Sequence, residues 1–374
     1  MRSLETARRT CEAFLPGLLD RLDEIPLREL ESPGSPAIEL FRRHGGPALV
    51  IPKVYAGSGA GPMEAVRTLR ALAAAAPSLA VATTMHHFSV ATLFALADSL
   101  KNSGMEWALL EGIATQNLLV ASGFAEGRPG TGILTPTMTA TSADGGYLVT
   151  GAKKPCSLSR SMDLLTASVE LPDGGMAVLL IPKNVDGITV HPFWSSWALA
   201  GAESDEVRLT DVFVQNDLIM RTELGAAGEL DELQTTGFLW FELLIASSYW
   251  GMASALVERL MRTGRGSAAE RAAVGIRLES AGLLLEGAAR MMAAGECDND
   301  ALARTLIARF AVQDALGAAV RDAVELLGGM AFVRDPDVAY LAAVSHALAF
   351  HPPSRSSLVQ PLVDYFGGAV LRIA

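Results

Sequence analysis

The sequence predicts an α+β fold in which a small β module lies between two helical blocks. Apolar residues recur at helical spacing through residues 1–118 and again after residue 223. Between these blocks, the stretch that begins at residue 120 is rich in alternating β-branched residues, Gly and Pro, which is typical of short strands and turns. We therefore expect an N-terminal helical domain over residues 1–118, a middle β-barrel or sandwich over 119–223, and a C-terminal four-helix bundle over 224–374.

The N-terminal block reads as several helices separated by turn residues. Helical spacing over residues 1–30 is broken by the Ser-Pro-Gly-Ser run at 32–35. A long Ala-rich helical region follows from Pro62 to about Leu100, with a break at its internal proline, Pro77. His86 and His87 lie in this apolar region, so we expect core histidines with satisfied hydrogen bonds there.

The middle block contains several strand candidates joined by Gly-rich turns. These candidates are Tyr147–Thr150, Leu164–Glu170, Met176–Ile181 and Val207–Val214. The turn Pro172-Asp173-Gly174-Gly175 joins two of them directly, as in a hairpin. Several short strands within about a hundred residues favour a small barrel or sandwich.

The C-terminal block predicts three long antiparallel helices with short connections. The expected helices are Asp231–Arg262, Ala268–Ala294 and Ala301–Leu327, and a shorter helix is expected over Ser357–Leu371. The glycine pair after Leu327 resembles a helix C-cap. Three such helices form a bundle once a fourth joins them.

Composition excludes several classes of function. The formal net charge is -11, which disfavours general nucleic-acid binding. Three cysteines without a Cys-x-x-Cys or His/Cys cluster indicate neither a disulfide framework nor a metal site. There is no uninterrupted apolar run of roughly 18 residues, so no membrane span is expected. The N-terminus lacks the apolar core of a signal peptide, which predicts a cytoplasmic protein.

Four motifs indicate a family. They are Ala125–Gly132 (A-E-G-R-P-G-T-G), Gly151–Ser157 (G-A-K-K-P-C-S), Leu199–Asp205 (L-A-G-A-E-S-D) and Ala323–Phe332 (A-V-E-L-L-G-G-M-A-F). With the order of the three blocks, they resemble the acyl-CoA dehydrogenase superfamily over roughly residues 30–350. That family carries T-E-P-x-A-G-S-D, N-G-x-K-x-W-I-T, M-G-x-R-x-S-D and A-V-Q-x-L-G-G-x-G-F at the corresponding places. Pro155 stands where the family has Trp, which would leave a flavin less shielded.

The resemblance implies an FAD cofactor and a set of residues that contact it. The implied contacts are Phe124, Ala125, Thr131, Ser157, Arg265, Glu325, Gly328 and Gly329. Ser157 would hold the place of the hydroxyl that hydrogen-bonds flavin N5, and the glycine pair would approach the adenosine diphosphate part of an FAD bound mainly by a neighbouring subunit. Paired glycines allow such close backbone approach. A homodimer or homotetramer is therefore expected.

Two residues are candidates for the catalytic base. In most of the family a glutamate in a Y-E-G-T run removes the substrate's α proton, and here His351 stands in that place. A neutral histidine can accept a proton at physiological pH. Other family members place the glutamate on the long helix after the β domain, where Glu242 is a lone carboxylate in an apolar run. A buried carboxylate needs a partner or a raised pKa.

The resemblance predicts an enzyme, and we expect FAD-dependent α,β-dehydrogenation of an acyl thioester in secondary metabolism. The substrate would be an acyl-CoA or an acyl-carrier protein, and the sequence does not define the electron acceptor. One alternative is a flavin-dependent monooxygenase of the same fold, because both the missing glutamate and a less shielded flavin are compatible with oxygen chemistry. The other is a non-catalytic binding subunit without FAD.

Apart from the resemblance, we expect Lys153 and Lys154 to be a solvated pair and Glu126 to be an exposed loop carboxylate.

Overall fold

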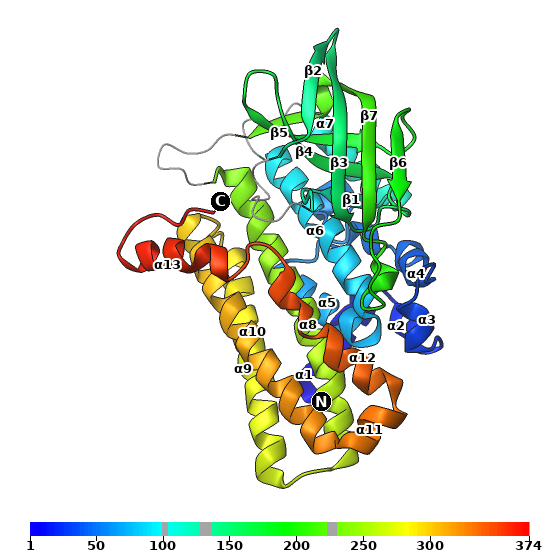
Figure 1. The fold of residues 1–374 in the computed structure, drawn as a ribbon, viewed down its shortest axis with the longest axis vertical. Coiled ribbons are helices and arrows are strands. Elements are labelled where there is room, and N and C mark those ends of the chain that lie inside the picture. Colours follow the sequence, from blue (N-terminus) through cyan, green and yellow to red (C-terminus); the bar gives the residue numbers. More distant parts are fainter. Residues whose placement is uncertain (99–103, 128–135, 223–229, 374) are drawn as a thin grey trace.

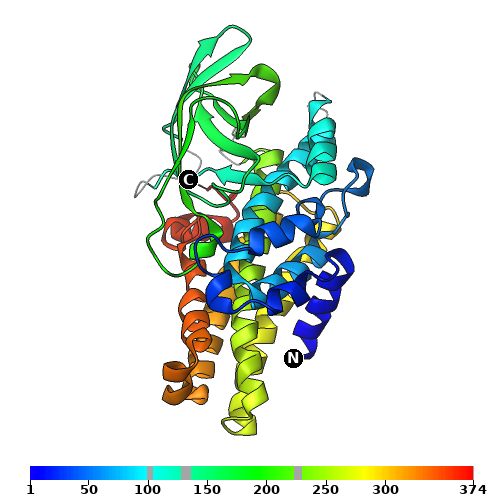
Figure 2. The ribbon, with the colours of Figure 1, turned by 90° about the vertical axis from the view of Figure 1, so that its right-hand side faces the viewer.

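A helical N-terminal region, a central sheet and a C-terminal helical region follow one another along the chain, as the α+β prediction requires (Figure 1). The computed structural model describes residues 1–98, 104–127, 136–222 and 230–373. The sheet lies at one end of a set of long helices, and the view turned by a quarter shows the same arrangement (Figure 2). The predicted fold class is confirmed.

The N-terminal region consists of seven α-helices in the described residues. They are α1 (Arg2–Phe14), α2 (Leu18–Asp23), α3 (Leu27–Leu30), α4 (Ala37–Arg43), α5 (Pro62–Ala75), α6 (Pro77–Asp98) and α7 (Met105–Gln116). Helix α6 is long and apolar enough to cross a membrane, but 72% of its apolar window is buried inside the protein. It packs against α5, α8 and strand β1, so it has the surroundings of a core helix.

The β module is one mixed sheet made of two halves. Its strands are β1 (Val120–Gly123), β2 (Thr139–Ala143), β3 (Gly146–Cys156), β4 (Leu164–Glu170), β5 (Met176–Pro182), β6 (Ile188–His191), β7 (Asp205–Gln215) and β8 (Ile219–Thr222). The order is β6-β7-β3-β2-β4-β5-β8, and β1 pairs in parallel with β4. Only Thr139 and Glu170 pair β2 with β4, so this contact joins the halves. Strands of four or five residues are too short to show a clear period in the sequence, which is why β1, β2, β6 and β8 were not predicted.

The C-terminal region contains the three long helices that the sequence predicts. They are α8 (Glu232–Thr263), α9 (Ala268–Ala293) and α10 (Asn299–Leu327), followed by α11 (Gly329–Arg334), α12 (Pro336–Val344) and α13 (Val359–Phe366). Capping boxes begin α8 at Asp231 and α9 at Ser267. Helix α13 is shorter than expected, because the chain leaves the helix at Gly367.

The helix that completes the bundle comes from the N-terminal region. Helix α5 packs along α8 and also contacts α9, while α10 packs against both α8 and α9. Helix α8 is buried on nearly every side, so it needs helices from both regions around it. The N-terminal helices and the three long C-terminal helices therefore share one core.

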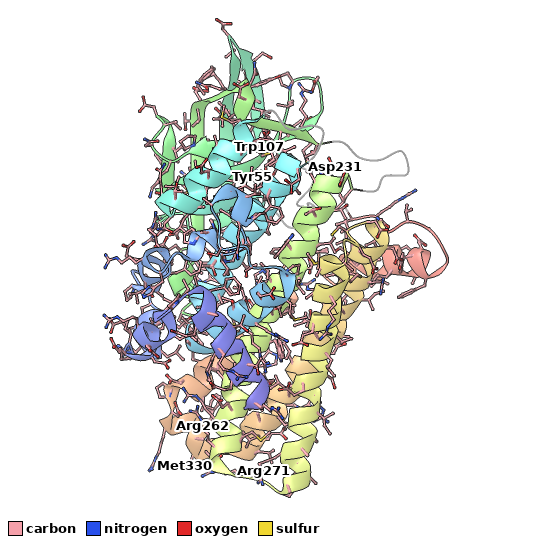
Figure 3. The ribbon with its side chains drawn as sticks, turned by 180° about the vertical axis from the view of Figure 1, so that it is seen from behind. Tyr55, Trp107, Asp231, Arg262, Arg271 and Met330 are labelled. Atoms are coloured by element: carbon pink, nitrogen blue, oxygen red, sulfur yellow. The ribbon has the colours of Figure 1, made fainter. Side chains whose placement is uncertain are left out.

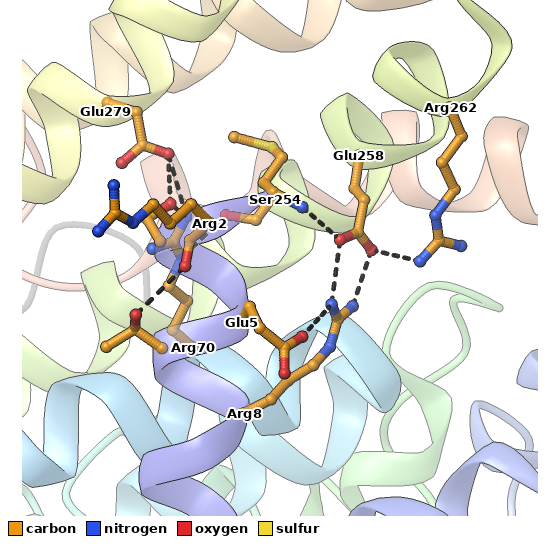
Figure 4. A network of polar contacts seen from close by, with 11 residues as sticks. Arg2, Glu5, Arg8, Arg70, Ser254, Glu258, Arg262 and Glu279 are labelled. Atoms are coloured by element: carbon orange, nitrogen blue, oxygen red, sulfur yellow. Dashed lines mark hydrogen bonds and ion pairs between the residues drawn. The ribbon is translucent and has the colours of Figure 1, made fainter.

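An ionic cluster fastens α1 to the end of α8 (Figure 4). Arg8 donates two hydrogen bonds to the two oxygens of Glu258, at 3.0 and 2.8 Å, and Arg262 donates a third at 3.0 Å. Burial alone would raise the pKa of Glu258, but the bonds from Arg8 and the neighbouring cations lower it from 4.5 to about 2. The carboxylate therefore stabilises the fold in its ionised form.

We predict that Glu258→Gln lowers the free energy of unfolding by about 1.5–3 kcal/mol at pH 7, the usual value for hydrogen bonds to a charged group. Because the folded pKa lies below the unfolded value, this difference is fully present above pH 4.5 and disappears as the pH falls through about 2. Urea unfolding across this pH range measures it. Glu24→Gln, at an exposed ion pair with Arg21, is the control and is expected to change stability by less than about 0.5 kcal/mol. Equal losses in both variants would contradict the prediction.

Candidate active site

Aromatic side chains from distant parts of the chain meet where the β module joins the helices. Phe124 follows β1, Phe88 lies on α6 and Phe241 on α8. The ring of Phe88 lies 6.0 Å from that of Phe124 and 5.4 Å from that of Phe241, measured between centroids. The ring of His351 lies 6.2 Å from Phe241. The fold thus connects two predicted site residues, Phe124 and His351, through a continuous aromatic wall.

A pair of hydroxyl groups lies on the β module. Ser157 follows β3 and its Oγ is 2.9 Å from the Oγ of Ser204, just before β7. Three non-glycine residues around this pair have left-handed backbone, with φ of 62° at Leu158, 58° at Leu199 and 54° at Glu203. Such conformations cost energy and cluster at functional sites. The Ser157–Ser204 pair therefore lies next to strained backbone of the kind that clusters at functional sites.

The segment that carries Phe124 and Ala125 is anchored to β3. The carbonyl oxygen of Ala125 accepts a hydrogen bond of 2.8 Å from the backbone N–H of Lys154. Ala125 therefore lies beside the motif that ends in Ser157. Thr131, also predicted to contact the cofactor, lies outside the described residues.

The expectation of a solvated Lys153 and an exposed Glu126 is wrong. Lys153 is fully buried, and its Nζ donates to Glu126 at 2.7 Å and to Ser168 at 3.0 Å. Burial lowers the pKa of Lys153, and Glu126 opposes this effect. Burial alone would raise the pKa of Glu126, but hydrogen bonds from Lys153 and Thr137 bring it down to about 2. A buried ion pair thus ties the segment after β1 to β3, which residue type and spacing could not reveal.

His351 is held as a neutral imidazole. It lies between two 3-10 turns, Ala347–Phe350 and Ser356–Leu358, and its Nε2 is 2.8 Å from the hydroxyl of Tyr249 on α8. Burial, with a smaller effect from Arg309, lowers the pKa of His351 from 6.5 to about 3. The side chain is therefore uncharged near neutral pH and can act there as a hydrogen-bonding group.

Glu242 lies one residue from Phe241 but turns toward the bundle. Its Oε2 is 3.4 Å from Nε of Arg309 on α10, and both side chains are almost completely buried. Neither oxygen of Glu242 has a hydrogen-bond partner among the described residues. Burial raises the pKa of Glu242 to about 7, although Arg309 lowers it. The structure thus puts this predicted base beside a cation that the sequence analysis did not single out.

The remaining predicted cofactor residues lie at the opposite end of the long helices. Arg265 donates to the carbonyl of Leu327, Gly328 ends α10 with φ of 79°, and Glu325 and Gly329 are exposed. Met330, next to Gly329, lies far from the β-module end that Trp107 and Asp231 mark (Figure 3). Arg265 and Gly328 lie side by side in the structure. Within one chain, however, Arg265 and Gly328 lie far from Ser157.

Four residues that sequence reasoning did not single out contact the predicted site residues: Phe88, Ser204, Tyr249 and Arg309. The available signal was weak: Tyr249 and Arg309 are polar groups in apolar helical runs, a pattern that also fits ordinary core residues.

No family model matches the chain. Over 378 residues, covering the whole of both proteins, it is 52% identical to the isobutylamine N-hydroxylase of Streptomyces viridifaciens. The chain belongs to the acyl-CoA dehydrogenase superfamily of flavoenzymes. Two solved structures show the same fold as this chain. KijD3 in complex with FMN and a dTDP-linked amino keto sugar matches 97% of the chain and 94% of its own length, with a TM-score of 0.85 and 19% identity. The prolyl acyl carrier protein oxidase AnaB matches 97% and 99%, with a TM-score of 0.80 and 17% identity.

The residues of this superfamily member fit the ring of a flavin. Phe124 and Phe88 are half-buried and Pro155 is exposed, so they leave apolar surface for a flat ring. Ser157 adds a hydroxyl that can donate or accept a hydrogen bond. The set therefore matches an aromatic ring system with polar edges.

We predict that Lys153→Met lowers the free energy of unfolding by about 3–5 kcal/mol, because it leaves Glu126 buried without its cation. Chemical denaturation measures this loss. The neighbouring Lys154→Met is the control, since Lys154 is partly exposed and pairs with Glu206 at 3.3 Å. It is expected to cost at most about 1 kcal/mol. A loss in Lys153→Met no larger than in the control would contradict a stabilising buried pair.

Proposed function

We propose that this flavoenzyme uses a reduced flavin and molecular oxygen to hydroxylate the nitrogen of a small primary aliphatic amine. The observation that carries the proposal is the 52% identity, over the whole chain, to an isobutylamine N-hydroxylase. Among the functions expected from the sequence, this is the monooxygenase alternative. Dehydrogenation of an acyl thioester on a CoA or carrier protein remains an untested prediction.

The nature of the residues around the site supports oxygen chemistry over dehydrogenation. A dehydrogenase needs a carboxylate at the substrate's α carbon. Here His351 stands in the usual place of that carboxylate, and Glu242 is turned toward Arg309. With a pKa of about 3, His351 is a weak base near neutral pH. We infer that His351, and not Glu242, meets the reacting atoms as a neutral hydrogen-bonding group.

The chemistry of an amine suits this environment. The overall reaction consumes an amine, O2, two electrons and two protons, and yields a hydroxylamine and water. A bound reduced flavin supplies the electrons for oxygen activation. An ammonium nitrogen has no free lone pair to attack oxygen, so an amine that enters as an ammonium ion must first lose its proton. The neutral amine then has the lone pair that N-oxidation requires.

We propose FAD as the flavin and at least two chains in the assembly. Phe124, Ala125 and Ser157 would hold the ring, with Thr131 contributing from the adjoining segment. The other predicted cofactor residues lie at the opposite end of the long helices, so they would meet the adenosine diphosphate part only from a second copy. They are Arg265, Glu325, Gly328 and Gly329. Exposed apolar side chains beside them support such a contact. These are Met330, Phe332 and Val333.

We predict that the purified protein, given a flavin reductase, NADH and O2, converts isobutylamine to its hydroxylamine. Because the amine must enter uncharged, the rate is expected to rise with pH between about 6 and 9 at fixed total amine. Mass spectrometry of the product with 18O2 measures oxygen incorporation. Absence of hydroxylamine from every primary amine tested, together with anaerobic bleaching of bound flavin by an acyl thioester, would favour dehydrogenation and overturn the proposal.

We predict that Ser157→Ala weakens binding of the flavin by about 1 kcal/mol, roughly fivefold, because one hydrogen bond to the ring is lost. Fluorescence quenching of added FAD measures the dissociation constant. Ser161→Ala, whose hydroxyl donates to Glu203 at 2.9 Å, is the control on the same turn and is expected to leave it unchanged. If FMN binds as tightly as FAD to the wild-type oligomer, the proposed role of the second chain in FAD binding fails.

A further inference from the structure

The segment that carries His351 contains little regular backbone hydrogen bonding. It runs through Pro352 and Pro353 between two short 3-10 turns. Proline has no N–H to donate, so the carbonyl groups of this segment depend on partners from elsewhere. An isolated loop of this kind would not hold an imidazole in one orientation.

Arg309 supplies those partners from inside the bundle. Its Nη2 donates to the carbonyl oxygens of Leu348 at 3.0 Å and His351 at 2.7 Å. Its Nη1 donates to the carbonyl of Pro353 at 2.7 Å. A planar guanidinium with several donors in a fixed arrangement can hold three carbonyls at once, which a lysine ammonium cannot reproduce. The backbone of His351 is therefore fastened directly to α10.

Glu242 balances the charge of this guanidinium. An isolated buried cation is costly, and the carboxylate 3.4 Å from Nε of Arg309 is its counter-ion. Tyr249 and His351 also feel the charge of Arg309, and both are neutral: burial raises the pKa of the Tyr249 hydroxyl far above its usual value and lowers that of His351. Arg309 is thus the permanent charge beneath the histidine, and Glu242, whose pKa burial raises to about 7, is its counter-ion when ionised.

The hydroxyl of Tyr249 orients the ring that Arg309 anchors through the backbone. The Tyr249 hydroxyl is hydrogen-bonded to Nε2 of His351. The His351 ring packs between the rings of Tyr249 and Phe241, whose centroids lie 5.5 and 6.2 Å from its own. No hydrogen bond to Nδ1 occurs within the described residues. One ring nitrogen is thus committed to α8, and the other is left for the site.

We propose that Arg309, balanced by Glu242, is a positioning residue that acts through His351. It holds the 348–353 backbone so that the imidazole contacts Tyr249 and Phe241 in a single orientation. This inference rests on the proposed function for its kinetic consequence, but its structural part concerns this chain alone. A buried ion pair is commonly no more stabilising than apolar residues of similar volume, so a positioning role gives a reason for its presence here.

The first test compares Arg309→Lys with Arg355→Met. Arg355 holds the far end of the same segment, bonding to the carbonyl of Phe310 at 3.0 Å and to Asp314 at 2.8 Å, and it is partly exposed. We expect Arg309→Lys to lower kcat for amine hydroxylation about tenfold, the factor that corresponds to losing one well-oriented hydrogen bond in the transition state. KM should change little, and Arg355→Met should stay within about twofold of wild type. Equal effects of the two variants would reduce Arg309 to a structural residue and overturn the inference.

The second test needs neither flavin nor substrate. Imidazole NMR signals of the protein labelled with [15N]histidine, which has six histidines, are assigned with His351→Gln. We expect one neutral tautomer of His351 between pH 5 and 8 in the wild type and in Arg355→Met, and shifted or exchange-broadened signals in Arg309→Lys. An unchanged His351 signal in Arg309→Lys would overturn the inference, whatever reaction the enzyme catalyses.

A double variant, Glu242→Leu with Arg309→Met, covers the case in which Arg309→Lys fails to fold. It removes both charges and keeps the volume, a replacement that buried ion pairs generally tolerate. We expect a cooperatively unfolding protein with a displaced His351 signal. A native His351 signal in this variant would show that Arg309 is not needed to position His351, and would overturn the inference. If the wild type hydroxylates no amine while its NMR signals behave as expected, the proposed function fails and the positioning role stands.

Discussion

The burial of α8 on nearly every side is the constraint on which the rest of the structure depends. A 32-residue helix with so little polar surface has to be covered by partners, and α5, α6, α9, α10 and α12 all pack against it. This covering joins the N-terminal and C-terminal regions in one core and leaves the β module at one end. Phe241 therefore contacts Phe88 on α6 as well as His351 near the C-terminus, and Tyr249 contacts His351 too.

Within that apolar setting, two buried pairs of opposite charge join separate elements near the site. Lys153 with Glu126 ties the segment after β1 to β3, and Glu242 with Arg309 joins α8 to α10. Each pair lies next to a predicted site residue, Ala125 in one case and His351 in the other. Because breaking a buried pair is costly, these connections restrict how the surrounding segments move. The site is thus held by ionic contacts on both of its sides.

The division of the predicted cofactor residues has a consequence for assembly. Ser157 and Phe124 lie by the β module, whereas Arg265 and Gly328 lie at the far ends of α8 and α10. A dinucleotide reaching both sets within one chain would have to run the length of the bundle. A second copy that presents its Gly328 end to the β module removes this difficulty, and the apolar residues exposed near Gly328 provide surface for it.

The sequence by itself determined the α+β class, the order of the three regions and the long helices, because apolar periodicity over 25 residues or more is a strong local signal. Its motifs also led to the superfamily, and they predicted Phe124, Ser157 and His351 as site residues. Only the tertiary structure decided that Lys153 is buried, that α5 completes the bundle and that Arg309 lies against Glu242 and the His351 segment. Those facts depend on contacts between residues far apart in the chain, and no local pattern records which distant group a side chain will meet.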